Sequence, residues 1–118
     1  MCKTDFIGQC TQKNVVYSLR CKICDGMGVK TEYVGESKRP IRLRYNEHLR
    51  DMVRRKEDTP MGDHVRTAHP EADCSSSSVE VRILYRAMDH PDRKIAESLM
   101  IRDRRPCLNS NVTSWPIM

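Results

Sequence analysis

Apolar and aromatic side chains are scarce in this chain. Of its 118 residues, 38% are apolar and 5% aromatic, with a single Phe and a single Trp. A core made from so few large side chains is small, and a domain this lean gains stability from a metal ion or another cross-link. No apolar run approaches the roughly 20 residues of a membrane-spanning helix, and Met1 to Cys10 lacks the apolar stretch of a signal peptide. We therefore expect one small intracellular domain without membrane contact.

The cysteine content bears on the compartment of the protein. Six cysteines are present, enough for three disulfides. Disulfides persist in oxidising compartments, whereas clustered cysteines in reduced, intracellular proteins are more often metal ligands. Because no signal peptide is recognisable, metal binding is the favoured interpretation. The alternative is a disulfide-rich extracellular domain, which predicts that the purified protein has no free thiols.

Positive charge is concentrated in one part of the sequence. The chain has a net charge of +5, and residues 38–56 alone hold eight Lys/Arg and two acidic residues, a local charge of +6. Such a segment produces a positive field suited to phosphate backbones. The plainer alternative is a solvated helix face. The arginines expected to contact a DNA backbone, without reading its sequence, are Arg42, Arg50, Arg54 and Arg55.

The pattern of apolar residues predicts three strands and three helices. Segments 14–20 and 30–35 are rich in β-branched and aromatic residues and flank a turn-rich stretch, which indicates an antiparallel hairpin. The remaining expected elements are a helix starting at Ser37, a shorter helix at 59–69, a polar loop at 70–78, a strand at 79–86 and a helix at 91–103. The fold class is therefore α/β, in the order β-β-α-α-β-α, with a small three-stranded, mainly antiparallel sheet flanked by helices.

Two of these helices have recognisable core positions. Ser37 is a candidate N-cap for the first helix, and Pro40 suits its first turn. The apolar stripe that should pack on the hairpin is Ile41, Tyr45, Leu49 and Met52. Arg44 and His48 lie at the edge of this stripe and are expected along the protein surface. The core candidates of the last helix are Ile95, Ala96, Leu99 and Met100.

The chain contains two pairs of potential zinc ligands. Cys21 and Cys24 form a C-x2-C pair, and His64 and His69 form an H-x4-H pair. Both spacings are typical of a tetrahedral Cys2His2 structural zinc site, in which four protein ligands leave no open position. The 39 residues between the pairs are too many for a free-standing zinc finger, so the zinc ion is expected to pin the hairpin to the second helix. The plainer alternative is two buried thiols and two surface histidines.

The other cysteines have no such spacing. Cys10 is an alternative zinc ligand. Cys2, Cys74 and Cys107 lack a partner at ligand spacing and are expected to be packed or incidental thiols.

A further set of residues occurs in an order typical of one enzyme family. Its members are Tyr17, Tyr33, Gly35, Arg44, His48, Glu97 and Asn109. This set resembles the GIY-YIG endonuclease superfamily, with Val15-Val16-Tyr17 in place of the first triplet and Tyr33-Val34-Gly35 matching the second. Arg44 corresponds to the helical arginine of the family. Glu97 corresponds to its metal-binding glutamate, and Asn109 to the asparagine of its terminal P-x-L-N element.

The placement of the cysteine pair makes the resemblance more specific. A C-x2-C pair between the two triplets, followed by a histidine pair, is similar to the endonuclease domains of Penelope-like retroelements. The resemblance covers residues 10–112, the expected endonuclease domain, and leaves 113–118 as a C-terminal tail. The departure is Val15-Val16 where the family has Gly-Ile, although the tyrosine is kept.

The resemblance implies a metal-dependent hydrolysis of DNA phosphodiester bonds. Glu97 would bind one catalytic Mg²⁺ or Mn²⁺ ion, which prefers hard oxygen ligands and acts as a Lewis acid. Arg44 would hold the phosphate and offset developing negative charge. Tyr17 or Tyr33 would activate or orient the attacking water, with His48 transferring a proton or orienting Tyr17. Gly35 would let the substrate backbone approach closely.

Plainer interpretations exist for several of these residues. Glu97 could pair with Arg93 or Lys94 at the surface, His48 could be structural, and Asn109 could only cap the tail. Tyrosine pairs in hairpins usually pack across strands. The alternative function is accordingly a zinc-stabilised nucleic-acid-binding module without catalysis.

The resemblance also implies a biological setting. The expected activity is a nicking endonuclease of a retrotransposon, located in the nucleus, with DNA as its partner and a reverse transcriptase adjoining it in the parent polyprotein. Target sequence and oligomeric state leave no signal in these residues.

Overall fold

The computed structural model describes residues 11–112, so Cys2, Cys10 and the tail at 113–118 lie outside the described residues. The strands are β1 (Val15–Cys21), β2 (Glu32–Ser37) and β3 (Val79–Arg86). The α-helices are α1 (Lys22–Gly26), α2 (Ile41–Arg54), α3 (Pro60–Ala68) and α4 (His90–Arg104), and the two short 3₁₀ helices are η1 (Ser76–Ser78) and η2 (Cys107–Val112). The predicted α/β fold is confirmed, with one addition. The turn-rich stretch after the first strand begins with the single helical turn α1, so the order is β-α-β-α-α-β-α.

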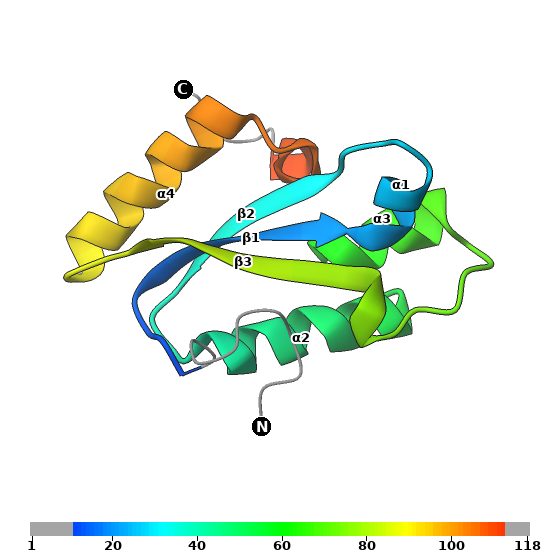
Figure 1. Ribbon diagram of the computed structural model, residues 1–118, viewed down its shortest axis with the longest axis horizontal. Coiled ribbons are helices and arrows are strands. Elements are labelled where there is room, and N and C mark those ends of the chain that lie inside the picture. Colours follow the sequence, from blue (N-terminus) through cyan, green and yellow to red (C-terminus); the bar gives the residue numbers. More distant parts are fainter. Residues whose placement is uncertain (1–10, 113–118) are drawn as a thin grey trace.

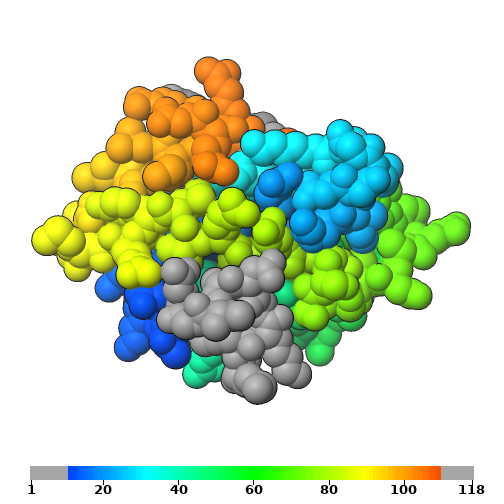
Figure 2. Space-filling view, viewed as in Figure 1, coloured from blue at the N-terminus to red at the C-terminus, as the bar shows by residue number. Residues whose placement is uncertain are grey.

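The first strand is the centre of the sheet. The strand order is β2-β1-β3, and β1 pairs antiparallel with both neighbours. A register shift between Val16 and Tyr17 marks a bulge in the β1–β3 pair, which bends a strand locally. Figure 1 shows the sheet between α4 on one side and α2 with α3 on the other. In the same view, β3 forms a band across the molecular surface (Figure 2).

Alternation along the strands divides the core between the two faces. Tyr17, Leu19 and Cys21 of β1 belong to the larger buried cluster, which includes side chains of α2 and α3. Val16, in contrast, packs with Val34 of β2 and Ala96 of α4 in a smaller cluster. This follows from the two-residue repeat of a strand, which sends successive side chains to opposite faces. None of the helices within residues 11–112 is long and apolar enough to cross a membrane.

Helix α2 covers the larger core with the predicted stripe. Ile41, Tyr45 and Met52 are buried, and Leu49 packs against them while partly exposed. The predicted start of this helix is wrong, because Ser37 is the last residue of β2 and Pro40 is the N-cap. The hydroxyl of Ser37 instead accepts a hydrogen bond from the backbone N–H of Arg39 at 3.1 Å. Ser37 therefore shapes the connection between strand and helix.

Helix α4 lies on the other face with a different side inward from the one predicted. Ala96 is buried, and Met100 is packed against the smaller cluster as predicted. Ile95 and Leu99, however, are 61% and 43% exposed, so their assignment to the core is wrong. The reason is that both ends of α4 are fixed by ion pairs to β2. Arg93 binds Glu36 of β2 through its Nε atom.

The C-terminal end of α4 is held in the same way. Arg104 donates from Nε and Nη2 to one carboxylate oxygen of Glu32, at 3.0 and 2.7 Å. Glu32 is 2% exposed, and such a buried charge is tolerated only with a partner of opposite sign. Glu32, Val34 and Glu36 share one face of β2. Their contacts with Arg104, Ala96 and Arg93 fix the rotation of α4 about its own axis.

Asn109 docks η2 onto the edge strand β2. Its side-chain oxygen accepts a hydrogen bond from the backbone N–H of Val34, and its side-chain nitrogen donates to the carbonyl of the same residue, each at 2.9 Å. Asn109 is 8% exposed. The segment that follows α4 is therefore held against the sheet as the 3₁₀ helix at residues 107–112.

Replacing Asn109 by Ala should destabilise the fold. The substitution removes both hydrogen bonds and leaves a buried N–H and C=O of Val34 without partners, which costs about 2 kcal/mol. Urea denaturation of the wild type and Asn109→Ala measures the loss. The control is Asp103→Ala at an exposed position of α4, which should change the unfolding free energy by about 0.5 kcal/mol or less. Equal stability of the two variants would contradict the role of Asn109.

Candidate functional site

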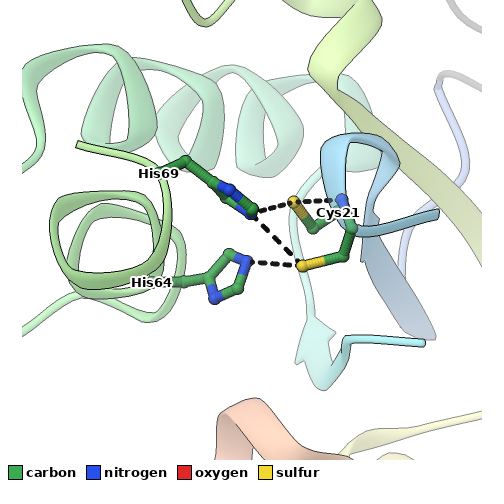
Figure 3. A group of neighbouring side chains, drawn as sticks. Cys21, His64 and His69 are labelled. Atoms are coloured by element: carbon green, nitrogen blue, oxygen red, sulfur yellow. Dashed lines mark hydrogen bonds between the residues drawn. The ribbon is translucent and has the colours of Figure 1, made fainter. Parts of the chain in front are cut away.

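The four predicted zinc ligands lie together. Their ligand atoms are all within 4.8 Å of one another. The Nε2 atom of His69 lies 3.2 Å from Sγ of Cys24 and 3.5 Å from Sγ of Cys21, and Nε2 of His64 lies 3.3 Å from Sγ of Cys24. In a tetrahedral zinc site the S–N separation is about 3.5 Å, given Zn–S near 2.3 Å and Zn–N near 2.0 Å. This Cys2His2 cluster, drawn in Figure 3, can therefore hold a zinc ion.

The ligands reach this position because two elements end or begin there. Cys21 ends β1 and is the N-cap of α1, where its sulfur accepts from the backbone N–H of Cys24 at 3.4 Å. On the facing side, Thr59 caps α3 by accepting from the N–H of Gly62, and Pro60 occupies the first helical position. His64 lies within α3, and His69, five positions further along the chain, is the C-cap of this helix. The structure confirms that the ligands on the hairpin side lie next to the ligands of the second predicted helix, α3.

Burial affects the protonation of two of these ligands, Cys21 and His64. It raises the pKa of the Cys21 thiol to about 11. Burial also lowers the pKa of His64, and the neighbouring His69 adds to that effect. The imidazole is thus held in the neutral form that ligates metals, while a cation would be needed to make the buried thiolates stable.

A second group of predicted residues gathers on the α2 face of the sheet. The hydroxyl of Tyr17 and Nε2 of His48 are 2.7 Å apart, and both side chains are buried. The ring of Tyr33 lies 6.4 Å from that of Tyr17 and 5.5 Å from that of His48, between centroids. His48 is 1% exposed, so the expectation of a surface position is wrong for it. Four residues make slightly more than one helical turn. His48 therefore projects from α2 in a direction slightly different from that of Arg44, and it points toward the two tyrosines.

Burial sets the protonation states within this group. It lowers the pKa of His48 to about 3, and the positive charge of Arg44 adds to that effect. Burial raises the pKa of Tyr17, and Tyr33 adds to the rise. At neutral pH the imidazole is therefore neutral and the phenol protonated, and the imidazole tautomer sets whether the phenol or Nε2 donates the hydrogen bond between them. The Nδ1 atom of His48 is buried without a hydrogen-bond partner among residues 11–112.

Glu97 approaches the tyrosines from the other side of the sheet. Burial is the main cause that raises the pKa of Tyr17 and of Tyr33, and the negative charge of Glu97 adds to both rises. The pKa of Glu97 is itself raised by burial, with a further rise from Glu36, while Lys94 opposes the shift. Lys94 lies 3.6 Å from its carboxylate. Two carboxylates of like charge thus share this region at the edge of β2.

Gly35 leaves the space in which the tyrosine rings pack. It pairs with Tyr17 across the β1–β2 ladder. A Cβ atom at Gly35 would lie 2.7 Å from the hydroxyl of Tyr17 and 2.8 Å from Cε2 of Tyr33. These separations are too short for carbon contacts, so any larger residue would displace the two phenols. In this structure the missing side chain makes room for tyrosines.

Arg44 belongs to a basic depression beside the tyrosines. Glu47, three residues further along α2, accepts from Nη2 of Arg39 at 2.7 Å and from Nη1 of Arg44 at 2.9 Å. These two partners lower the pKa of the Glu47 carboxylate to about 2. The depression is lined by Glu36, Ser37, Lys38, Arg39, Arg44, His90 and Arg93. Sequence reasoning missed Glu47, although its spacing of three from Arg44 is a signal of helical pairing.

The other arginines and cysteines named in the sequence analysis differ in exposure. Arg42, Arg50 and Arg54 are exposed. Arg55 is different, because its guanidinium donates to backbone carbonyls of α3 and the loop that follows. Cys74 is packed against the core and Cys107 is exposed. Cys21, Cys24 and Cys74 form no disulfide. Comparisons of the chain with protein-family models, curated proteins and solved structures found no match.

His48 should make the stability of the fold depend on pH. Its pKa of about 3 in the folded chain lies below its usual value of 6.5, so the unfolded chain takes up the proton first. The stabilising effect is complete above pH 6.5 and is lost as the pH falls from there toward 3. Between pH 7 and pH 4.5 the wild type should lose about 2 to 3 kcal/mol more than His48→Gln, measured by chemical denaturation.

The same comparison contains its own control. Protonation of the Cys2His2 cluster affects the wild type and His48→Gln alike, so the difference between their pH profiles isolates His48. Parallel profiles would show that His48 is not held neutral by burial.

Proposed function

We propose that this chain is a metal-dependent DNA endonuclease of the GIY-YIG type, stabilised by a zinc ion at its Cys2His2 cluster. The observation that supports it best is the hydrogen bond of 2.7 Å between Tyr17 and His48, with Tyr33 and Arg44 beside it. Residues from both strands of the hairpin and from α2 thus meet, as the resemblance expects. The proposal further assigns the domain to a retroelement polyprotein with an adjoining reverse transcriptase.

Hydrolysis of a phosphodiester requires a water oxygen to bond to phosphorus while the bond from phosphorus to the leaving oxygen breaks. The phenol oxygen of Tyr17 can accept a proton from the water while its own proton passes to Nε2 of His48. His48 is free to accept because it is neutral at pH 7. The negative charge of an arriving phosphate raises the proton affinity of this imidazole.

Charge stabilisation would come from the arginine side of the site. Glu47 holds Arg44 and Arg39 in place, so their guanidinium groups need little rearrangement to meet the phosphate. The basic depression extends from Arg44 to Lys38 and Arg93. This depression suits the next phosphate along the DNA strand. Contacts between arginine or lysine and phosphate position DNA without reading its sequence.

Glu97 is the residue that would hold the catalytic cation. Its carboxylate offers the hard oxygen that Mg²⁺ or Mn²⁺ prefers, and such ions commonly use one or two carboxylates together with substrate phosphate. The nearby charge of Glu36, which raises the pKa of Glu97, is a repulsion that a divalent cation would relieve. When bound, the cation supplies Lewis-acid stabilisation of the phosphate.

The nuclease proposal is tested by nicking of supercoiled plasmid in Mg²⁺. The wild type should nick, and Glu97→Ala should lose about a hundredfold or more of the activity, since an interaction that stabilises the transition state is worth several kcal/mol. Asp103→Ala, at an exposed position of the same helix, is the matched control and should nick at the wild-type rate. Circular dichroism and zinc content establish that the variants are folded.

The outcomes separate the two candidate functions. Equal nicking by wild type and Glu97→Ala would point to a contaminant or a misplaced site. DNA binding without nicking in either protein would favour the zinc-stabilised nucleic-acid-binding module. That alternative is favoured by the basic depression and the Cys2His2 cluster, neither of which needs Glu97.

The zinc proposal has a separate test. One zinc ion per chain is expected by elemental analysis, and a chelator should make the thiols of Cys21 and Cys24 reactive. Zinc at a hundred times its Kd stabilises a fold by about 2.7 kcal/mol, so its removal should lower the unfolding free energy by at least that much. Cys21→Ser should lose the ion, whereas Cys107→Ser, at an exposed cysteine, should keep it. A purified protein without free thiols would instead support the disulfide-rich alternative.

A further inference from the structure

Arg55 connects the end of α2 to the segment that carries His69. Its Nη1 atom donates to the carbonyl of Val65 at 3.1 Å and to the carbonyl of His69 at 2.9 Å. Its Nη2 atom donates to the carbonyl of Ala72. One guanidinium thus holds three carbonyls in the last turn of α3 and the loop that follows.

Two of these carbonyls, those of Val65 and His69, lie at the C-terminal end of α3, where each also accepts one backbone hydrogen bond. The last C=O groups of a helix have no intrahelical N–H, and their dipoles favour a positive charge nearby. His69 itself is the C-cap of α3, with its N–H donating to Val65. Arg55 therefore acts on the two carbonyls, those of Val65 and His69, that define where the His69 backbone lies.

The side chain of His69 contacts both sulfurs of the Cys2His2 cluster. Its Nε2 atom lies within 3.5 Å of both sulfurs, and the residue is 7% exposed. A ligand at a helix end, followed by a loop, has fewer constraints than one within a helix. Within residues 11–112, the other hydrogen bonds of the His69 backbone are its N–H donating to Val65 and its carbonyl accepting from the N–H of Ala72.

From these contacts we infer that Arg55 is a positioning residue of the metal cluster, holding His69 in the geometry that binds zinc. The inference rests on the proposed zinc binding. It also gives Arg55 a role different from the DNA contact expected of it. Groups that orient metal ligands without touching the metal typically change metal affinity by about 10- to 100-fold when removed.

The backbone of Arg55 provides a way to remove its side chain without straining the fold. Arg55 is the C-cap of α2 and has φ +53° and ψ +43°, the left-handed conformation. Glycine adopts this conformation more readily than any other residue. Arg55→Gly should therefore keep the fold while removing the three hydrogen bonds.

The chain also contains a matched control. Arg105 is the C-cap of α4, with φ +48° in the same left-handed region, and it is exposed. Arg105→Gly makes the same chemical change at the same kind of helix end, on a helix that carries none of the four ligands of the metal cluster.

The test measures zinc affinity by competition with a chromogenic chelator. Arg55→Gly should bind zinc about tenfold or more weakly than the wild type, and Arg105→Gly should bind within about twofold of it. Arg55→Lys, which keeps the charge but lacks the forked donors, should fall between wild type and Arg55→Gly. Absorption of the cobalt-loaded proteins should show a distorted tetrahedral site in Arg55→Gly only.

The outcomes distinguish this inference from the proposal on which it rests. A wild type that binds zinc with the same affinity as Arg55→Gly would overturn the role of Arg55 while leaving the zinc site intact. A wild type that binds no metal would overturn both. A role limited to general stability would lower the unfolding free energy of the zinc-free Arg55→Gly chain and leave its zinc affinity and cobalt spectrum unchanged.

Discussion

The structure depends on the pairing of β1 with strands on both of its sides. This central strand carries Tyr17 and Cys21 on one face, four residues apart, which separates the tyrosine group from the Cys2His2 cluster by about 13 Å. Tyr17 faces α2, and Cys21 faces α3. A single rigid strand thus fixes the distance between a candidate reaction centre and a metal cluster. Val15, Val16, Tyr17, Leu19 and Cys21 are all fully buried, as a strand enclosed on both faces requires.

The sequence was informative wherever one local rule decided the structure. Strand alternation and the helical stripe of α2 predicted the elements and most of the larger core, and ligand spacing predicted the four residues of the metal cluster. The errors in the core of α4 arose because two different faces of this helix satisfy the same helical repeat. Apolar residues on α4 allow either Ile95 with Leu99 or Ala96 with Met100 to face the sheet. The ion pairs of Arg93 and Arg104 with β2 decide between them, and such contacts between distant residues leave no periodic signal.

The candidate site shows the same division. The residues named by the resemblance were identified from the sequence, but the environment that determines their chemistry was not. Burial of His48 lowers its pKa to about 3, which follows from the packing of α2 against the sheet and not from any spacing. The carbonyl contacts of Arg55 were likewise hidden in a run of basic residues, because a charge run predicts solvent exposure and gives no sign of a folded-back guanidinium.

The carboxamide of Asn109 has a consequence for how this protein meets other copies of itself. β2 is an edge strand, and the open backbone of an edge strand is a template on which another chain can add a strand. The carboxamide carries the same donor and acceptor as a peptide group, and it occupies both the N–H and the C=O of Val34. At the middle of β2 it therefore stands where a fourth strand would bind. The Asn109 side chain thus opposes edge-to-edge aggregation by blocking the backbone of Val34.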